Sequence, residues 1–152
     1  MRVAWIAATQ EIVERLVMAK RYTDLHTNLL MQAAINEFCR QGHYDAHLRR
    51  LHKIYRLRRR KLLDALEREF PAEVCWTRPD GGYALWVSMP EKIDAEELLK
   101  SAEQRGVSFT PGNRFYPERG GEHCFRLCFS RTDGEQIDEG VAALGALIKE
   151  RL

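Results

Sequence analysis

The sequence has no long apolar run and no strong excess of charge of one sign, and these absences exclude several classes of protein. No hydrophobic stretch approaches the roughly 20 residues that a membrane-spanning helix needs. The 24 lysines and arginines against 22 aspartates and glutamates give a formal net charge of +2, too small to indicate a nucleic-acid-binding protein. With 45% hydrophobic and 30% charged residues among 152, the composition is that of one ordinary globular domain.

Cysteine is scarce, and the N-terminal apolar stretch is too short and too soon acidic for a signal peptide. We therefore expect a cytoplasmic protein whose four cysteines are reduced: Cys39, Cys75, Cys124 and Cys128. The last two are four residues apart in a predicted strand, about 13 Å between Cα atoms, which is too far for a disulfide. His43 and His47 are one helical turn apart, but no third ligand follows at suitable spacing, so no metal site is predicted.

The hydrophobic pattern predicts an α+β fold, a small and mostly antiparallel sheet covered by helices. Strands are expected over residues 2–8, 74–78, 83–89, 107–110 and 124–130, and helices over 10–20, 29–40, 45–70, 94–105 and 132–148. The segment Pro79-Asp80-Gly81-Gly82 between two alternating stretches predicts a hairpin. Residues up to about 42 have no sheet of their own and are expected to need a partner outside this sequence.

Two helices of the second half are preceded by capping-box patterns, in which a polar N-cap is followed three residues later by Glu or Gln. Asp94 with Glu97 is expected to begin one helix, and Thr132 with Glu135 the last.

One stretch of the long predicted helix carries eight basic residues with no acid between them. A basic helix can follow a phosphate backbone, which leaves direct nucleic-acid binding as an alternative. A solvated helix face is the favoured interpretation, because the apolar stripe runs through the same segment and acids follow at once. The eight residues are Arg49, Arg50, Lys53, Arg56, Arg58, Arg59, Arg60 and Lys61.

Arg126 occupies an unusual position in the middle of a predicted strand. Alternation places it on the face opposite Phe125, Leu127 and Phe129. A guanidinium there costs free energy unless a planar anion meets it in bidentate geometry. The pattern leaves two alternatives open, an anion-binding arginine and an arginine on the solvent face of a half-exposed sheet.

Three motifs occur in the order and at the spacing of a known family. They are residues 77–87 (TRPDGGYALWV), 106–115 (GVSFTPGNRF) and 125–130 (FRLCFS). Together they resemble the C-terminal part of class I/II aminotransferases, the fold-type I pyridoxal-phosphate enzymes. The segments 24–27, 44–50 and 55–59 are most similar to MocR-type regulators, in which a GntR-like winged helix is fused to an aminotransferase-like domain. The 2-aminoadipate and aromatic aminotransferases are the next most similar groups.

The resemblance implies roles for six residues. Arg126 matches the arginine that pairs with the α-carboxylate of the amino acid. Arg2 matches the arginine that binds the phosphate of the cofactor, and Thr27-Asn28 matches a loop that reaches the cofactor site of the neighbouring subunit. Tyr83 and Phe115 fall on loops that line the substrate pocket.

The resemblance also places the Schiff-base lysine a few residues before the position of Arg2, so we expect a fragment that contains no catalytic residue of its own. Residues 1–42 then correspond to the end of the large cofactor domain with interdomain helices, and 43–152 to the small domain. The implied partners are an amino acid, the large domain and a second subunit, with pyridoxal 5'-phosphate in the longer protein and no membrane.

The favoured hypothesis is the effector-binding domain of a MocR/GntR-type regulator, which would contact DNA only through a separate domain. The alternatives are the C-terminal part of a catalytic 2-aminoadipate or aromatic aminotransferase, and a stand-alone binding module without catalysis.

Overall fold

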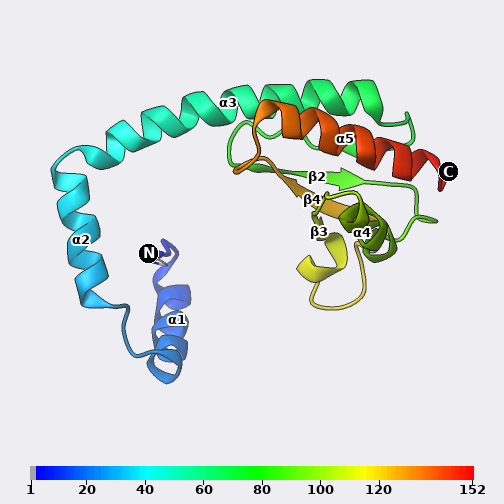
Figure 1. The fold of residues 1–152 in the computed structure, drawn as a ribbon. Helices are drawn as coiled ribbons and strands as arrows, with labels where there is room; N and C mark the ends of the chain where they lie inside the picture. The colour runs from blue at the N-terminus through cyan, green and yellow to red at the C-terminus, as the bar shows by residue number, and fades with distance from the viewer. Residues whose placement is uncertain (1–2) are drawn as a thin grey trace. The chain divides into compact units, whose positions relative to one another are not determined.

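The computed structural model describes residues 3–152, which form two compact units divided between Arg50 and Leu51. The first contains α1 (Gln10–Thr23), α2 (Leu29–Arg40) and the beginning of α3 (His43–Glu69). The second contains the remainder of α3 and all later elements (Figure 1). These are β1 (Cys75–Trp76), β2 (Ala84–Ser88), α4 (Ala95–Gln104), β3 (Thr110–Pro111), the 3-10 helix η1 (Gly112–Phe115), β4 (Cys124–Cys128) and α5 (Gly134–Lys149).

The first unit buries no residue of α1 or α2. Its apolar side chains are largely solvent-exposed, among them Trp5, Ile6, Leu29 and Leu30. The strand predicted over residues 2–8 is wrong for the described part of that segment. Residues 3–8 are irregular and mostly exposed, because a strand needs a hydrogen-bonding neighbour and no described strand pairs with them. No helix of the described chain is long and apolar enough to cross a membrane.

The second unit confirms the α+β prediction. Its four strands form one antiparallel sheet in the order β1-β2-β4-β3. The hairpin predicted around Pro79 joins β1 to β2, in which Trp76 pairs with Val87. In this unit, α5 and the C-terminal part of α3 lie side by side over one face of the sheet (Figure 1). Their close approach requires Gly145, because a Cβ there would lie 2.6 Å from the carbonyl oxygen of Glu69.

The core lies between the sheet and these helices. Leu85 and Val87 of β2 and Phe125 and Leu127 of β4 are buried on the covered face. They pack with side chains from three helices, including Leu62, Leu66, Leu98, Ile137, Val141, Leu144 and Ile148. Since successive strand residues face opposite sides, this packing directs the alternate residues of β2 and β4 to the other face of the sheet.

Two element boundaries differ from the sequence prediction. The strand expected over 107–110 is β3, only Thr110–Pro111, and the chain turns directly into η1. The capping box of α5 is formed by Asp133 and Gln136, one residue after the predicted Thr132 and Glu135. The N-cap predicted for α4 is confirmed, because the Asp94 carboxylate accepts a hydrogen bond from the Glu97 backbone N–H at 2.9 Å.

Candidate substrate-carboxylate site

Arg126 lies at the centre of the sheet. In β4 it pairs with Trp86 of β2 on one side and with Thr110 of β3 on the other. Directly opposed residues of antiparallel strands share a face, so Trp86 and Arg126 both lie on the face that does not contribute to the core. Both are half-buried, as the alternation of β2 and β4 requires.

The guanidinium of Arg126 is incompletely satisfied. Its Nε is buried and has no hydrogen-bond partner in residues 3–152, and none of the ion pairs in that range includes Arg126. A buried donor without a partner costs about 1–3 kcal/mol, and more when it is charged. A planar carboxylate is the ligand that matches this donor geometry. A half-buried arginine with an unpartnered Nε differs from a fully solvated guanidinium.

Phe115 is the residue that contacts the guanidinium. The Cζ atom of Arg126 lies 4.9 Å from the centroid of the Phe115 ring, a cation–π geometry. The ring of Trp86 meets the same phenyl ring edge-on, with 5.5 Å between centroids and 76° between planes. Phe115 remains 45% exposed, so one side of this cluster is open to a ligand.

The position of Phe115 depends on η1, which is packed tightly against β4. Pro111 pairs with Phe125 immediately before η1 begins. A Cβ at Gly112 would lie 2.5 Å from the Gly121 carbonyl oxygen and 2.8 Å from the Cys124 Cβ, so only glycine fits. At the same loop, the Tyr116 ring packs over Gly121. The loop therefore holds Phe115 in place through backbone-to-backbone packing.

Tyr83, the other predicted pocket residue, lies just before β2 and is 52% exposed. Its carbonyl oxygen accepts a hydrogen bond from the Phe129 N–H at 2.9 Å, which closes the end of the β2–β4 ladder. Within the described chain its side chain has no hydrogen bond or ring contact with the cluster of Trp86, Phe115 and Arg126. The structure brings Phe115 to Arg126 and does not bring Tyr83 there.

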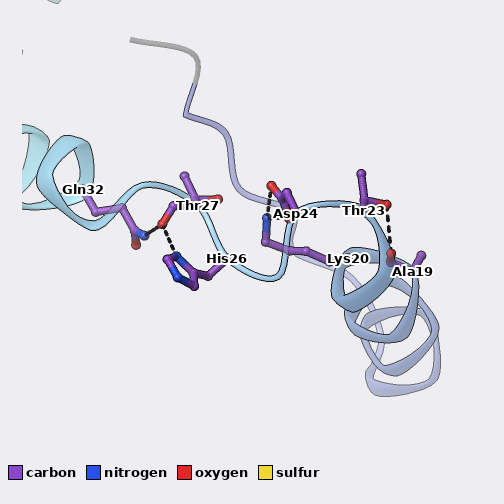
Figure 2. Close-up of polar contacts among 7 residues, drawn as sticks. All are labelled: Ala19, Lys20, Thr23, Asp24, His26, Thr27 and Gln32. Carbon is purple, nitrogen blue, oxygen red and sulfur yellow. Dashed lines mark hydrogen bonds and ion pairs between the residues drawn. The ribbon is translucent and has the colours of Figure 1, made fainter.

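Thr27 and Asn28 belong to the first unit, where they form the joint before α2. Figure 2 shows Thr27 beside Gln32. The Thr27 carbonyl oxygen accepts a hydrogen bond from Gln32 Nε2 at 2.8 Å. The Asn28 side chain caps α2 by accepting from the Met31 N–H at 3.1 Å. Leu25 in the same joint has φ +63°, a left-handed conformation that is strained for a bulky residue and that the sequence does not signal. Arg2, the predicted phosphate ligand, lies outside the described residues.

The basic stretch of α3 is partly used for folding. Arg58 donates to the Ser130 carbonyl oxygen, Arg59 to the Pro79 carbonyl oxygen, and Lys61 Nζ lies 2.9 Å from Asp138. These contacts join α3 to the loops and to α5. Part of the basic stretch therefore stabilises the fold and is not simply the solvated face that was predicted. In the described residues no group of three potential ligands is arranged to hold a metal ion, and all four cysteines are free.

Sequence reasoning missed Trp86 as a site residue, although it lies in the second half of the TRPDGGYALWV motif. The signal that could have found it is the alternation of side chains along the strand. Leu85 and Val87 face the core, so Trp86 faces the other side of the sheet, which is the face of Arg126 once the strand register is known.

A helix-covered antiparallel sheet of this kind is the architecture of an aminotransferase small domain. The crystal structure of LysN, the α-aminoadipate aminotransferase of Thermus thermophilus complexed with N-(5'-phosphopyridoxyl)-L-leucine, matches 94% of this chain and 36% of its own. The TM-score is 0.81 at 39% sequence identity.

The sequence comparisons agree. Residues 1–144 match the family of class I and II aminotransferases. The 2-aminoadipate transaminase of Thermus thermophilus is 40% identical over 149 residues, covering 98% of this chain and 37% of that protein. The HTH-type transcriptional regulator YdcR of Escherichia coli is 35% identical over 151 residues, covering 99% and 32%. The chain therefore belongs to the class I and II aminotransferases, a pyridoxal-phosphate-dependent family, and spans about 37% of the length of that transaminase.

Among the predicted site residues, Arg126 and Asn28 differ in the polar groups that they leave free. The unpaired Arg126 Nε is a carboxylate donor, whereas the Asn28 amide oxygen is already occupied by its cap.

Proposed function

We propose that this chain is the C-terminal part of a catalytic, pyridoxal-phosphate-dependent amino-acid aminotransferase, in which Arg126 binds the α-carboxylate of the substrate. The observation that carries the proposal is the half-buried Arg126, whose Nε has no partner in the described chain. The comparisons support an enzyme more than a regulator, since identity is 40% to the 2-aminoadipate transaminase and 35% to YdcR.

In this proposal Arg126 orients the substrate. Two parallel N–H donors of a guanidinium match the two oxygens of a carboxylate, so they fix the plane and direction of the amino acid as well as its position. The aromatic pair of Phe115 and Trp86 limits the motion of the guanidinium on one side. Pyridoxal phosphate, when bound in the longer protein, supplies the electron sink for exchange of the amino group.

The effector domain of a MocR-type regulator is the second candidate, because YdcR matches 99% of this chain. The sequence feature that favoured a regulator was the pattern from His47 to Arg59, which overlaps the basic stretch of α3. In that stretch, Arg58, Arg59 and Lys61 make contacts within the fold, which explains their charge without reference to a regulator. Arg126 would bind a carboxylate in either protein, so turnover is the property that separates the two hypotheses.

The test uses the complete protein that contains this chain, purified with pyridoxal phosphate. It is incubated with a 2-oxo acid acceptor and a panel of L-amino acids that includes 2-aminoadipate and an aromatic amino acid. We expect repeated turnover, measured as oxo acid formed from the donor over many enzyme equivalents. Binding of the amino acid without turnover, together with specific DNA binding, would support the regulator and overturn the enzyme proposal.

A further inference from the structure

Trp86 is linked to the guanidinium of Arg126 indirectly, through the ring of Phe115. Trp86 lies directly opposite Arg126 in the β2–β4 ladder, yet the residue that covers the guanidinium is Phe115, from η1. Trp86 contacts the Phe115 ring edge-on at 5.5 Å. An edge-to-face pair of this kind directs the positive edge of one ring toward the negative face of the other.

The backbone of Trp86 is itself fixed. Its carbonyl oxygen accepts a hydrogen bond from the Thr77 N–H at 2.9 Å, and its N–H donates to Thr77 Oγ1 at 2.9 Å. Trp86 is therefore held on both sides, by Thr77 and by the pairing with Arg126. The packing of η1 fixes the backbone that carries Phe115, but the Phe115 side chain is 45% exposed and its ring contacts Trp86 and Arg126.

Arg126 depends on its neighbours for orientation. No carboxylate of the described chain pairs with it, and its Nε forms no hydrogen bond there. A long side chain that is not fixed by polar partners loses rotamer freedom when a ligand binds, which reduces affinity. Among residues 3–152, the contact that has a preferred geometry and limits this freedom is the one with the Phe115 ring.

From this chain of contacts, we propose that Trp86 is a positioning residue for substrate binding: it holds the Phe115 ring against the guanidinium and so pre-orients Arg126 for the carboxylate. Trp86 acts through Phe115 and does not touch the substrate. The inference rests on the proposed role of Arg126 as the carboxylate ligand.

The test measures amino-acid affinity in the complete, cofactor-loaded protein by titration of the cofactor absorbance. Trp86→Ala is expected to raise the Kd for an L-amino acid about three- to tenfold, the loss typical of one aromatic pair. Binding of the corresponding amine, which lacks the carboxylate, should not change. Trp86→Phe retains an aromatic edge and should restore most of the affinity, whereas Trp86→Leu retains apolar volume alone and should not.

Trp76→Ala is the matched control. Trp76 lies on β1 of the same sheet and packs edge-on against Phe70, with 6.1 Å between centroids, so its loss disturbs packing without touching the Phe115–Arg126 pair. The Trp76 variant should lose stability and keep its amino-acid Kd.

A double-mutant cycle decides whether Trp86 acts through Phe115. In a Phe115→Ala background, Trp86→Ala should add no further loss of affinity. Full additivity of the two losses, or an equal loss for the amino acid and the amine, would overturn the proposal. The proposal would also be overturned if Trp86→Leu kept the Kd of the unaltered protein while Arg126→Ala weakened binding. That result would leave the role of Arg126 intact. If Arg126→Ala itself leaves the Kd unchanged, both the carboxylate role and this inference fail.

Discussion

At the scale of the residue, Gly112 occupies a position that has no room for a side chain. A Cβ there would lie 2.5 Å from the Gly121 carbonyl oxygen, and backbone cannot move as a flexible side chain can. We expect Gly112→Ala to destabilise the fold by about 1–3 kcal/mol, measured by denaturant unfolding. Because Gly112 begins the turn that carries Phe115, the variant should also weaken amino-acid binding.

Gly81→Ala is the control for this substitution, since a Cβ at Gly81 meets nothing within 4 Å. Its effect should stay within about 0.5 kcal/mol, as for ordinary surface substitutions. Equal destabilisation by the two variants would contradict the packing explanation for Gly112.

The sequence was sufficient to single out Arg126, because alternation along one strand places it opposite three apolar neighbours. It was not sufficient to assign Trp86. The contact of Trp86 with Phe115 depends on the pairing of β2 with β4 and on how η1 packs against β4. Local hydrophobic periodicity predicts neither of these. The expected role of Tyr83 in lining the substrate pocket stays a prediction, since that pocket is not defined by the contacts of the described residues.

At the scale of the element, the beginning of α5 tests how a helix is capped. Asp133 accepts a hydrogen bond from the Gln136 N–H at 2.9 Å, and Gln136 Oε1 accepts one from the Asp133 N–H at 3.1 Å. We expect Asp133→Ala to cost about 1 kcal/mol of unfolding free energy, because it leaves helix N–H groups without a partner. Thermal or denaturant unfolding measures the loss.

Thr132→Val is the matched comparison. The Thr132 hydroxyl is buried and forms no hydrogen bond within the described chain, so its replacement by a methyl group should be neutral or slightly stabilising. If Thr132→Val lowered the free energy of unfolding more than Asp133→Ala does, Thr132 would be the N-cap, as the sequence predicted.

Both positions satisfy the capping-box pattern, so the local sequence offers two possible starts for the helix. Local sequence does not decide this, whereas it did decide Asp94, where one pattern alone was present. The expected strand over 107–110 is shortened for a related reason. Only Thr110 and Pro111 pair with β4, and the chain then turns into η1.

At the scale of the whole molecule, an ion-pair network joins α3 to α5 in the second unit. Asp138 of α5 lies 2.9 Å from Lys61 Nζ and 3.0 Å from Arg68 Nη2 of α3. Hydrogen bonds from Lys61 and then Arg68 lower the pKa of Asp138 below its ordinary value. A carboxyl with a lowered pKa in the folded state stabilises the fold above its unfolded pKa, and this contribution is lost as pH falls through the folded pKa.

Asp138→Asn should therefore be less stable than the parent protein at neutral pH. The difference should shrink as pH falls through about 4, where an ordinary aspartate is half protonated, and toward the lower pKa of the folded state. Unfolding midpoints of the two proteins between pH 7 and acid, taken at low and high salt, measure this convergence. A difference that stays constant down to the lowest pH would show that Asp138 acts through packing and not through its charge.

The fold class of the whole molecule could be predicted because the second unit has strong periodicity and clear turn signals. The first unit was predicted in part: its helices lie close to the predicted bounds, at Gln10–Thr23 and Leu29–Arg40, whereas the strand expected over 2–8 was wrong for the described residues 3–8. Its apolar residues have the pattern of a buried helix face, but no residue of α1 or α2 is buried in the described structure. Periodicity reports that a face is apolar, but it does not report which surface will cover it.

The most direct measurement of the central claim compares binding of an L-amino acid with binding of its decarboxylated amine to the complete protein. We expect the unaltered protein to prefer the amino acid by about a hundredfold, as is typical when one partner of a buried charge pair is removed. Arg126→Ala should lose most of this preference, while Arg131→Ala, at an exposed arginine five positions along the chain, should keep it. If the Arg126 variant still prefers the amino acid as strongly as the unaltered protein does, Arg126 is not the carboxylate ligand.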